Sequence, residues 1–309
     1  MQQTDNLQSL TAALRAEDLP FVSQEPLTRH TTFQIGGPAA LFCRPEKISA
    51  LARILELCRS HQVRYYLLGN GSNTLFSDAG FPGVVICTTA LCPRPVITEQ
   101  PDGTSLVCAG AGMKLSVLCT VAQEQALTGL EFAYGIPGTV GGAVYMNAGA
   151  YGGEMRDVLE RVTFLDEKGG MHTLGVEDLA LGYRTSIFEK KPWCVLEAVF
   201  RLKKGEPEVI RTVMQDFMQR RRDKQPLEMP SAGSTFKRPD GAFAGRLIEQ
   251  CGLRGFSVGG AAVSTKHCGF VVNQGGATCA DVVALTDEVA RIVRERTGFV
   301  LEREIRVVE

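Results

Sequence analysis

The stretch GLEFAYGIPGTVGGAVYMNAGAYGG, residues 129–153, places eight of the chain's 33 glycines within 25 positions. Glycine permits positive φ and carries no Cβ, so backbone amides can turn towards a phosphate or a flat ring and approach it closely. A flexible linker would instead be rich in serine and other polar residues. Here apolar and aromatic side chains interleave with the glycines, among them Phe132, Tyr134, Ile136, Val140 and Tyr145. The composition therefore predicts a wall that lies against a ligand.

Length and charge limit the classes of protein that fit this chain. Its 309 residues exceed the usual size of one hydrophobic core, so we expect two or three domains. The formal net charge of -1 supplies no basic surplus for nucleic acid or an anionic membrane. The N-terminus, MQQTDNLQSL, lacks the pattern of a secretory signal, and no run of about 18 apolar residues occurs. We expect a cytoplasmic protein that binds neither nucleic acid nor membrane; its protein partners cannot be named from composition.

The ten cysteines and four histidines form no disulfide or metal-binding pattern. No CxxC pair occurs, and Cys58, Cys87, Cys108 and Cys119 each lie inside an apolar run. No two histidines are three or four residues apart, as neighbouring ligands on a helix would be. We therefore expect buried, reduced thiols and no metal site.

Periodicity divides the chain into three units of mixed α and β structure, at residues 1–90, 91–204 and 205–309. The glycine-rich wall lies in the second unit, and the third begins near the turn at residues 205–207. Helices are predicted at residues 5–15, 46–61, 114–127 and 280–296, and strands at 65–68, 83–87, 105–109, 162–165, 171–174, 194–202, 270–273 and 300–308. The predicted fold class is α+β.

Two common nucleotide-binding motifs are incomplete or missing. Residues 106–118, LVCAGAGMKLSVL, arrange a strand, two glycines and a helix in the order of a dinucleotide-binding turn. Leu115 occupies the place of the third glycine, however, and no acidic residue follows about 20 residues later at the end of a second strand. The pattern GxxxxGK[ST] does not occur either. A Rossmann domain and a P-loop hydrolase are both disfavoured.

A second glycine turn is formed by GNGSN at residues 69–73. Its asparagine and serine side chains can bond their own backbone or a ligand oxygen, and its glycines suit a nest of amides around a diphosphate. Alone, this sequence fits a plain turn equally well. Together with residues 129–153 it could hold the two ends of a long, flat cofactor that bears a diphosphate.

Five motifs, in order, closely resemble the UDP-N-acetylenolpyruvoylglucosamine reductase (MurB) family: GNGSN, EFAYGIPGTVGGAVYMNAGAYGGE, YRTSIF, PSAGSTFKRP and LEREIRVV. The resemblance runs from about residue 31 to the C-terminus. It implies a FAD-binding fold of the vanillyl-alcohol-oxidase (PCMH) type, in which two α+β subdomains hold FAD and a C-terminal α+β domain binds substrate. It also implies an oxidoreductase that uses NADPH and non-covalent FAD to reduce UDP-N-acetylglucosamine enolpyruvate to UDP-N-acetylmuramate, in bacterial peptidoglycan synthesis.

By the same resemblance, Ser234 is the proton donor, Arg184 the catalytic arginine and Glu304 the catalytic glutamate. A serine hydroxyl is a weak acid and suits only a strongly basic carbanion or enolate, which this reaction forms. The planar cation of arginine suits a carboxylate whose charge grows in the transition state. Alternation along a strand puts Glu302 and Glu304 on one face, so geometry does not choose between them and only the motif selects Glu304. The family commonly has proline where this chain has Arg303.

Further residues are implied as ligand-binding groups. The FAD-binding set is Gly69, Asn70, Gly71, Ser72, Asn73, Gly135, Ile136, Pro137, Gly138, Thr139, Gly141, Gly142 and Asn147. The substrate-binding set is Tyr183, Lys224, Lys237 and Arg238. The cations of the two lysines and the arginine suit the UDP phosphates or NADPH. Some family members have asparagine in place of Arg238. The run at 220–222 is interpreted as a solvated helix end that favours the helix dipole. Only 50 positions separate Arg184 from Ser234, which resembles the branch lacking an extra tyrosine-bearing loop.

Two other functions share much of this pattern. An oxidase of the same FAD fold would act on an alcohol, carry covalent flavin and return electrons to oxygen. His30 and His61 lie in the FAD region but outside the glycine turns, which argues against it. A sugar-nucleotide sensor would keep the fold without the chemistry. The presence of Arg184, Ser234 and Glu304 argues against the sensor.

Overall fold

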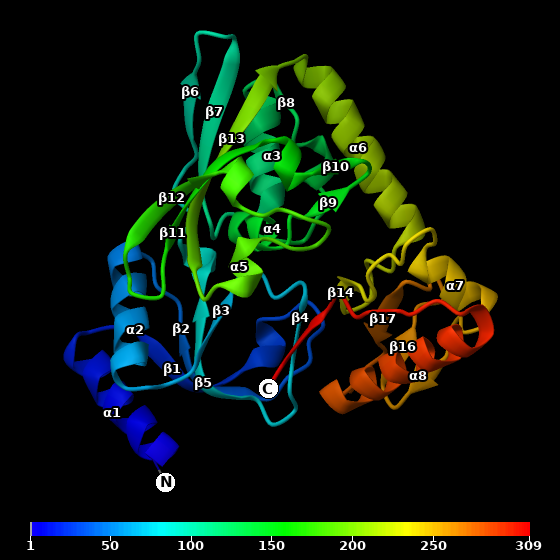
Figure 1. Ribbon diagram of the computed structural model, residues 1–309, viewed down its shortest axis with the longest axis horizontal. Helices are drawn as coiled ribbons and strands as arrows, with labels where there is room; N and C mark the ends of the chain where they lie inside the picture. The colour runs from blue at the N-terminus through cyan, green and yellow to red at the C-terminus, as the bar shows by residue number, and fades with distance from the viewer. Residues whose placement is uncertain (1) are drawn as a thin grey trace. The chain divides into compact units, whose positions relative to one another are not determined.

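The computed structural model describes residues 2–309 (Figure 1), and the contacts within it define two compact units. Unit 1 comprises the residues up to Ser23 together with Leu41–Asn70 and Gly83–Gln219. Unit 2 comprises Gln24–Ala40, Gly71–Pro82 and Arg220–Glu309. The chain passes between the units five times, so each unit is assembled from segments far apart in the sequence. The boundaries expected near residues 90 and 204 remain predictions.

Helices form where apolar residues recur at helical spacing. The α-helices are α1 (Gln2–Ala16), α2 (Ile48–Ser60), α3 (Leu115–Glu124), α4 (Val140–Tyr145), α5 (Ile187–Lys190), α6 (Pro207–Lys224), α7 (Ala244–Gln250) and α8 (Cys279–Thr297). The short 3-10 helices are η1 (Leu27–Arg29), η2 (Thr88–Ala90), η3 (Glu131–Ala133), η4 (Met155–Asp157) and η5 (Val176–Asp178). In α2 the expected apolar stripe includes the buried Leu51, Leu55 and Cys58, whereas Ile48, expected in the same stripe, is 39% exposed in the first turn.

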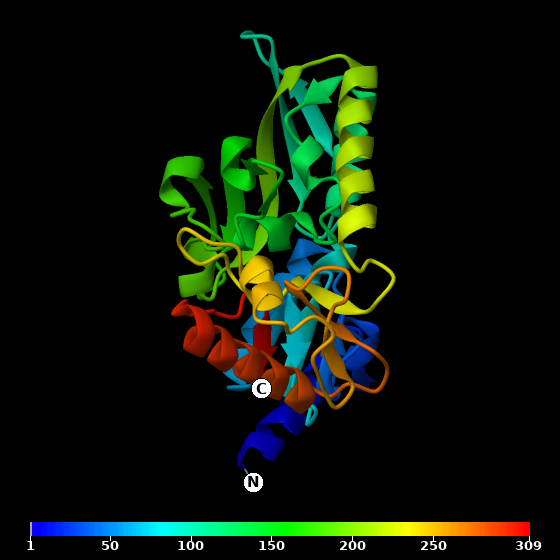
Figure 2. The ribbon, with the colours of Figure 1, turned by 90° about the vertical axis from the view of Figure 1, so that its right-hand side faces the viewer.

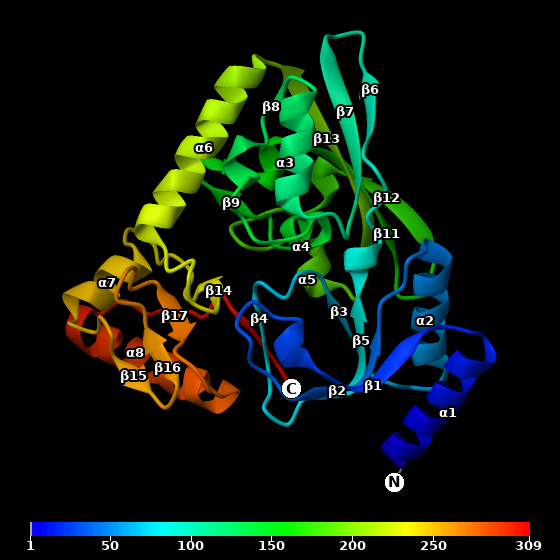
Figure 3. The same ribbon diagram turned by 180° about the vertical axis from the view of Figure 1, so that it is seen from behind.

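The large sheet of unit 1 has the strand order β12-β11-β13-β7-β6, with β8 also paired to β13. Its neighbouring strands are antiparallel. The strands are β6 (Val96–Glu99), β7 (Thr104–Gly110), β8 (Leu127–Thr128), β11 (Leu159–Leu165), β12 (Met171–Gly175) and β13 (Cys194–Lys204). Helix α4 packs on β13 and β7, and Figure 3 shows α3 and α4 over this sheet. The glycine-rich wall is thereby attached to a rigid support, whose core includes Val107, Leu118, Val144 and Phe200.

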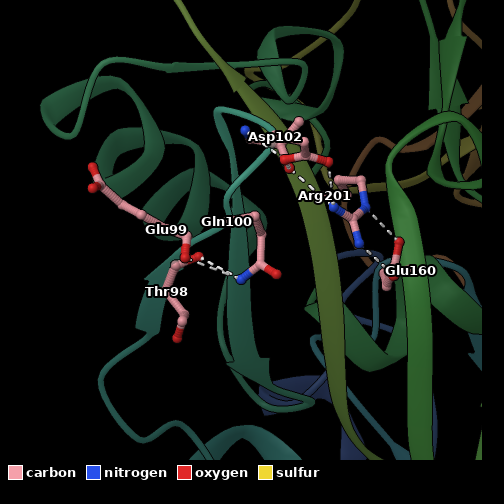
Figure 4. A network of polar contacts seen from close by, with 7 residues as sticks. Thr98, Glu99, Gln100, Asp102, Glu160 and Arg201 are labelled. Carbon is pink, nitrogen blue, oxygen red and sulfur yellow. Dashed lines mark hydrogen bonds and ion pairs between the residues drawn. The ribbon is translucent and has the colours of Figure 1, made fainter.

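Arg201 connects three adjacent strands of this sheet (Figure 4). Its Nε and Nη2 donate to the two carboxylate oxygens of Glu160, each at 2.8 Å. Its Nη1 donates to Thr104 Oγ1 at 2.9 Å and to Asp102 Oδ2 at 3.3 Å. The guanidinium holds the pKa of Glu160 below its usual range. This bidentate geometry fixes the orientation of the half-buried pair, which a single hydrogen bond between two surface charges would not do.

A second sheet follows the order β1-β2-β5-β3, formed by β1 (Phe21–Pro26), β2 (Pro38–Cys43), β3 (Tyr65–Leu68) and β5 (Phe81–Cys87). β3 and β5 run parallel. Helices α1 and α2 pack on each other, and their buried faces form a separate core in unit 1 that includes Leu10, Leu14, Leu51 and Ile86. A small hairpin, β9 (Gly149–Ala150) and β10 (Gly153–Glu154), also lies in unit 1.

Unit 2 contains a four-stranded sheet in the order β14-β17-β16-β15. Its strands are β14 (Ser231–Ser234), β15 (Ser257–Val258), β16 (Ala261–Val263) and β17 (Phe270–Asn273). Helix α8, orange to red in Figures 1 and 2, packs against β15 and β16. Away from this sheet, β4 (Thr74–Phe76) pairs in parallel with the closing strand β18 (Arg306–Val308). Phe33, Leu75, Val271 and Leu285 belong to one core, so the segments of unit 2 fold together.

The N-terminus of α8 is capped twice. Thr278 Oγ1 accepts from the Asp281 amide and Asp281 accepts from the Thr278 amide, which forms a capping box. The Asp78 carboxylate accepts from the amides of Cys279 and Ala280 at 2.7 and 3.0 Å. Asp78 lies in the loop after β4, so this cap ties α8 to the segment that follows the 69–73 turn.

All ten cysteines carry free thiols, and eight are buried as expected, whereas Cys92 is exposed and Cys108 is half-buried. Burial raises the pKa of Cys43 and of Cys58 to about 12. These groups are therefore protonated at neutral pH and unsuited to nucleophilic chemistry. Within residues 2–309, no helix is long and apolar enough to cross a membrane. The same residues contain no cluster of three or more histidine, cysteine, aspartate or glutamate side chains that could hold a metal ion.

Candidate active site

The predicted cofactor turn at residues 69–73 is divided between the two units. Gly69 and Asn70 belong to unit 1, and the remaining three residues belong to unit 2. In unit 1 the Asn70 side chain donates to the Pro137 carbonyl at 2.7 Å. A Cβ on Gly69 would lie 2.6 Å from Thr139 Oγ1. The start of this turn and residues 135–142, predicted separately as cofactor-binding segments, are therefore adjacent.

Residues 135–142 are fixed to the turn between β7 and α3. The amides of Val140 and Gly141 donate to the carbonyls of Met113 and Ala111, each at 2.8 Å. A Cβ on Gly141 would lie 2.9 Å from the Ala111 Cβ, closer than real Cβ contacts. Thr139, which is 1% exposed, accepts from the Gly142 amide and caps α4. Close packing of backbone on backbone thus explains part of the glycine content that the sequence assigns to a ligand.

In unit 2 the rest of the 69–73 turn packs against other backbone segments. Gly71 has φ +62°, and a Cβ there would lie 2.1 Å from the His30 carbonyl oxygen. The Asn73 side chain donates to the Glu304 carbonyl at 3.1 Å, and the Arg306 amide donates to the Asn73 carbonyl at 3.0 Å. The end of the predicted cofactor turn and the predicted catalytic glutamate are therefore joined directly.

Ser234 follows a β-bulge. Along β14 the register advances three residues, from Ser231 to Ser234, while β17 advances only two, from Val272 to Phe270. Gly233 has φ +78°, which admits the extra residue without a Cβ clash. Bulges change the direction of the next side chain, and Ser234 is exposed here, with a long bond of 3.4 Å from its hydroxyl to the Phe236 carbonyl.

Glu304 lies on the segment paired with residues 235–237. Its amide donates to the Thr235 carbonyl at 2.8 Å, so it adjoins the residue that follows Ser234. Glu304 is half-buried, whereas the Glu302 side chain is 71% exposed and pairs with Lys237 at 3.5 Å. The structure thus separates two glutamates that strand alternation leaves equivalent. Only Arg306–Val308 of the expected closing strand 300–308 is a regular strand, since the preceding residues pair with 235–237 through a single isolated bridge.

Arg184 occupies a strained turn in unit 1. Gly182 and Thr185 exchange two backbone hydrogen bonds, of 3.0 and 3.3 Å, across Tyr183 and Arg184. Arg184 has φ +56°, a left-handed conformation that costs a non-glycine residue about 1–2 kcal/mol. Its Nη2 donates to the Gly149 carbonyl at 3.0 Å, and its guanidinium carbon lies 5.2 Å from the centre of the Tyr183 ring.

Two buried side chains support this turn. One, Ser186, comes from the segment YRTSIF, and the other, Asn147, comes from the end of α4. Ser186 is 1% exposed, donates to the Tyr145 carbonyl at 2.7 Å and accepts from the Phe188 amide. Asn147 is 0% exposed, and its carboxamide donates to the Gly182 carbonyl at 3.0 Å and accepts from the Arg156 amide at 2.9 Å. Ser186 is not among the site residues predicted from the sequence, although its place two residues after Arg184 is a signal that points to it.

The remaining predicted substrate residues lie in unit 2, except Tyr183. Lys224 ends α6, and Lys237 donates its amide to the Glu302 carbonyl. The Arg238 guanidinium carbon lies 4.5 Å from the centre of the exposed Phe243 ring. Unit 2 therefore brings together Ser234, Glu304 and the end of the 69–73 turn, and unit 1 brings together Arg184, Tyr183 and the glycine-rich wall.

The residues of the two glycine turns fit a flavin dinucleotide. Neither 69–73 nor 135–142 contains a carboxylate, so an anionic diphosphate would meet amides, hydroxyls and carboxamides without repulsion. The bond from Asn70 to Pro137 holds the two turns adjacent within unit 1. The donor set is thus of the kind that binds diphosphates through the backbone.

Comparisons with known proteins identify both parts of the chain. Residues 39–175 match the family model described as "FAD binding domain". Residues 225–308 match the model described as "UDP-N-acetylenolpyruvoylglucosamine reductase, C-terminal domain". A curated UDP-N-acetylenolpyruvoylglucosamine reductase from Lachnoclostridium phytofermentans is 50% identical over 284 residues, which cover 92% of this chain and 91% of that protein.

Solved structures agree with these matches. The UDP-N-acetylenolpyruvylglucosamine reductase (MurB) of Thermus caldophilus is 37% identical, with a TM-score of 0.76, over 94% of this chain and 99% of that one. A solvent-stable cholesterol oxidase is 15% identical, with a TM-score of 0.50, over 61% of this chain and 38% of that one. The second likeness shows the fold alone. The α+β, FAD-binding fold class predicted from the sequence is confirmed.

Proposed function

Because the chain belongs to the UDP-N-acetylenolpyruvoylglucosamine reductase (MurB) family, we propose that it reduces UDP-N-acetylglucosamine enolpyruvate to UDP-N-acetylmuramate with NADPH and FAD. It is an FAD-dependent oxidoreductase of bacterial peptidoglycan precursor synthesis. The direct pairing of the Glu304 amide with the carbonyl of Thr235, next to Ser234, is the observation that carries the proposal. Since NADPH and a UDP-sugar are its substrates, we propose that it works in the cytoplasm.

The flavin would be held by the two glycine turns. Gly69, Asn70 and residues 135–142 of unit 1 supply backbone amides and the Thr139 and Asn70 side chains. Gly71, Ser72 and Asn73, which continue the same turn in the sequence, are assigned to the same role by the resemblance to the family. Bound there, FAD would supply the hydride chemistry, with NADPH as the donor and the terminal methylene carbon of the enolpyruvyl group as the acceptor. The protein's side chains would then stabilise the negative charge on the substrate and donate the proton that completes the reduction.

Ser234 is the proposed proton donor. After hydride transfer, the carbon next to the carboxylate is an enolate-like carbanion, which is basic enough to take a proton from a hydroxyl. The Ser234 side chain is exposed and makes only one long hydrogen bond, of 3.4 Å, so little has to be broken for it to meet the substrate. The bulge at Gly233 sets its direction.

Arg184 and Glu304 are the other proposed catalytic groups. The Arg184 guanidinium would stabilise the charge that grows on the substrate carboxylate as the intermediate forms. Its strained backbone supports this assignment, because such conformations concentrate at functional sites. Glu304 would act in the same half-reaction as Ser234, and its half-buried position supports it over the exposed Glu302.

The UDP group and NADPH are anionic and would be met by the cations of unit 2. Lys237 and Arg238 follow Ser234 by three and four residues, and Lys224 ends α6 in the same unit. Tyr183 adjoins Arg184 and offers an exposed ring and hydroxyl. We assign these four residues to substrate binding. The spacing of Arg184 and Ser234 supports the branch without the extra tyrosine-bearing loop.

An anaerobic two-step experiment tests the function. Purified yellow protein is mixed with NADPH, which should bleach the flavin band near ~450 nm that is common to oxidised flavins. Addition of the UDP-enolpyruvyl sugar should then restore the colour without oxygen. Colour that returns only with oxygen would support an oxidase instead, and a colourless protein that still binds UDP-sugars would support a sensor. Either result would overturn the proposal.

A further inference from the structure

The residue after the C-cap of α4 is an asparagine in a glycine position. Asn147 has φ +41°, and the amides of Asn147 and Ala148 donate to the carbonyls of Val144 and Ala143, which closes a Schellman motif. Glycine is the usual residue at such a position because it has no Cβ. Asparagine is the other residue found at this position, so the backbone alone does not choose between glycine and asparagine.

The Asn147 side chain is fully buried and both ends of its carboxamide are bonded. A carbonyl can only accept and an amide N–H can only donate, so the carboxamide has one orientation, with Nδ2 towards the Gly182 carbonyl and Oδ1 towards the Arg156 amide. The side chain thus bridges η4 and the turn that contains Arg184. Asn147 is 35 residues from Gly182 in the sequence and nine residues from Arg156.

The turn at Gly182 depends on this bridge. Of its two internal hydrogen bonds, the one accepted by the Gly182 carbonyl from Thr185 is the longer, at 3.3 Å, whereas Asn147 reaches the same carbonyl at 3.0 Å. Arg184 is held at positive φ in the position of the turn where glycine or asparagine is usual. Strain of this kind persists only where surrounding contacts over-determine the conformation.

We propose that Asn147 is a positioning residue for Arg184: its buried carboxamide fixes the Gly182 carbonyl, and so holds the strained turn that presents the guanidinium. The proposal rests on the catalytic role proposed for Arg184. It differs from the role in FAD binding implied by the sequence resemblance, because both polar ends of the side chain are bonded to the protein's own backbone.

Two variants and one matched control separate the side chain from the backbone. Asn147→Gly keeps and relaxes the left-handed backbone while removing the carboxamide. Asn147→Asp keeps the size and the acceptor for Arg156 but points an oxygen at the Gly182 carbonyl. The control is Gln62→Gly, since Gln62 occupies the same position of a Schellman motif after α2, with φ +55° and an exposed side chain.

The first measurement is amide hydrogen exchange over residues 182–187 in each protein, which does not depend on activity. We expect faster exchange there in both Asn147 variants and wild-type exchange in Gln62→Gly. Unchanged exchange in Asn147→Gly and Asn147→Asp would overturn the proposal whatever reaction the protein catalyses. This readout therefore also stands if the proposed function fails.

The second measurement separates the two half-reactions. Bleaching by NADPH should stay within about twofold of wild type in both Asn147 variants, while recovery with the UDP-enolpyruvyl sugar should slow by about ten- to hundredfold, as for a displaced catalytic group. In an Arg184→Ala background, adding Asn147→Gly should cause no further slowing, because both changes act through one group. Additive losses, or equal slowing of both half-reactions, would place Asn147 with the cofactor and overturn the proposal.

Discussion

The Arg184 turn of unit 1 and the Ser234–Glu304 region of unit 2 are held by different kinds of hydrogen bond. Around Arg184 the two backbone bonds between Gly182 and Thr185 are supplemented by bonds from the buried side chains of Asn147 and Ser186 to carbonyls of other segments. Around Ser234 the main bonds join backbone to backbone, with Thr235 to Gly269 and Glu304 to Thr235 each at 2.8 Å. One region depends on particular side chains for its shape, and the other depends on strand pairing.

This difference determines what a substitution can reveal. Removing an exposed side chain from a backbone-held segment leaves its geometry intact, so the loss measures chemistry. Removing a buried side chain from the Arg184 turn changes geometry and stability together. Substitutions in the Ser234–Glu304 region should therefore change activity without changing the free energy of unfolding. Substitutions of the buried side chains at the Arg184 turn should change both together.

Ser234→Ala should give the largest loss of activity, with the smallest accompanying change in the free energy of unfolding. Recovery of flavin colour with the UDP-enolpyruvyl sugar should slow by about two to four powers of ten, as for a lost general acid. Bleaching by NADPH should be nearly normal, and the free energy of unfolding should change by less than about 0.5 kcal/mol because the side chain is exposed. Rapid-mixing absorbance and urea unfolding measure these quantities. Equal slowing of both half-reactions would remove Ser234 from the role of proton donor.

Glu304→Gln should also act on chemistry more than on stability. The backbone bonds of Glu304 to Thr235 and Asn73 do not involve the carboxylate, so they survive the change. We expect recovery with the UDP-sugar to slow by about tenfold or more. Glu302→Gln is the matched control, since its carboxylate makes only an exposed pair with Lys237 that contributes little. If Glu302→Gln slows the reaction and Glu304→Gln does not, the motif selects the wrong glutamate.

Local patterns were sufficient to predict several elements of both units. The strands at 65–68 and 270–273 have the bounds that their apolar runs predict. β11 and β12 form the hairpin expected around Gly169, where Asp166 also accepts from the amides of Lys168 and Gly170. In each case the signal is contained within a few consecutive residues.

Features that depend on distant partners could not be predicted in this way. The bulge before Ser234 exists only in register with β17, about 36 residues later, and no local signal marks it beyond Gly233. Asn147 has an acceptor that lies 35 residues away, so its sequence neighbourhood shows only a glycine-rich helix end. The closing strand is shorter than its alternation predicts, because its first residues meet the 235–237 segment rather than a full strand.

Ser186→Ala tests the prediction that activity and stability change together at the Arg184 turn. The hydroxyl is buried and bonds both the Tyr145 carbonyl and the Phe188 amide, so we expect a loss of about 1–3 kcal/mol in the free energy of unfolding. Recovery with the UDP-sugar should slow by about tenfold through displacement of Arg184.

Ser60→Ala is the control for this change. It also removes a serine bond to a carbonyl, that of Leu57, but at the exposed end of α2. Its effect on unfolding should stay below about 0.5 kcal/mol. A Ser186→Ala protein with normal stability and slowed recovery would show that side chains do not hold this turn as described.

His267 is one of the side chains that also bond the Ser234 region, together with Asn73 and Thr235, and its substitution should give the smallest effect. Its Nδ1 accepts from the Gly269 amide at 3.0 Å, and the Gly269 carbonyl accepts from the Thr235 amide. Burial lowers the pKa of His267 below its usual value of 6.5. The unfolded chain therefore binds more protons than the folded one at pH values between the lowered pKa and about 6.5. Stability should accordingly be lost as the pH falls through this interval, since an imidazolium cannot accept from Gly269.

His267→Asn should remove this pH dependence, because its Oδ1, attached to Cγ as Nδ1 is in histidine, can accept the same bond at every pH. Urea midpoints at pH 7.5 and pH 5.5 measure it in both proteins, with the wild type losing more stability on acidification than the variant. Parallel losses would mean that other groups control the acid response and that strand pairing alone holds the Ser234 segment. A smaller loss in the variant would show that one half-buried imidazole reinforces the backbone bonds on which the position of Ser234 depends.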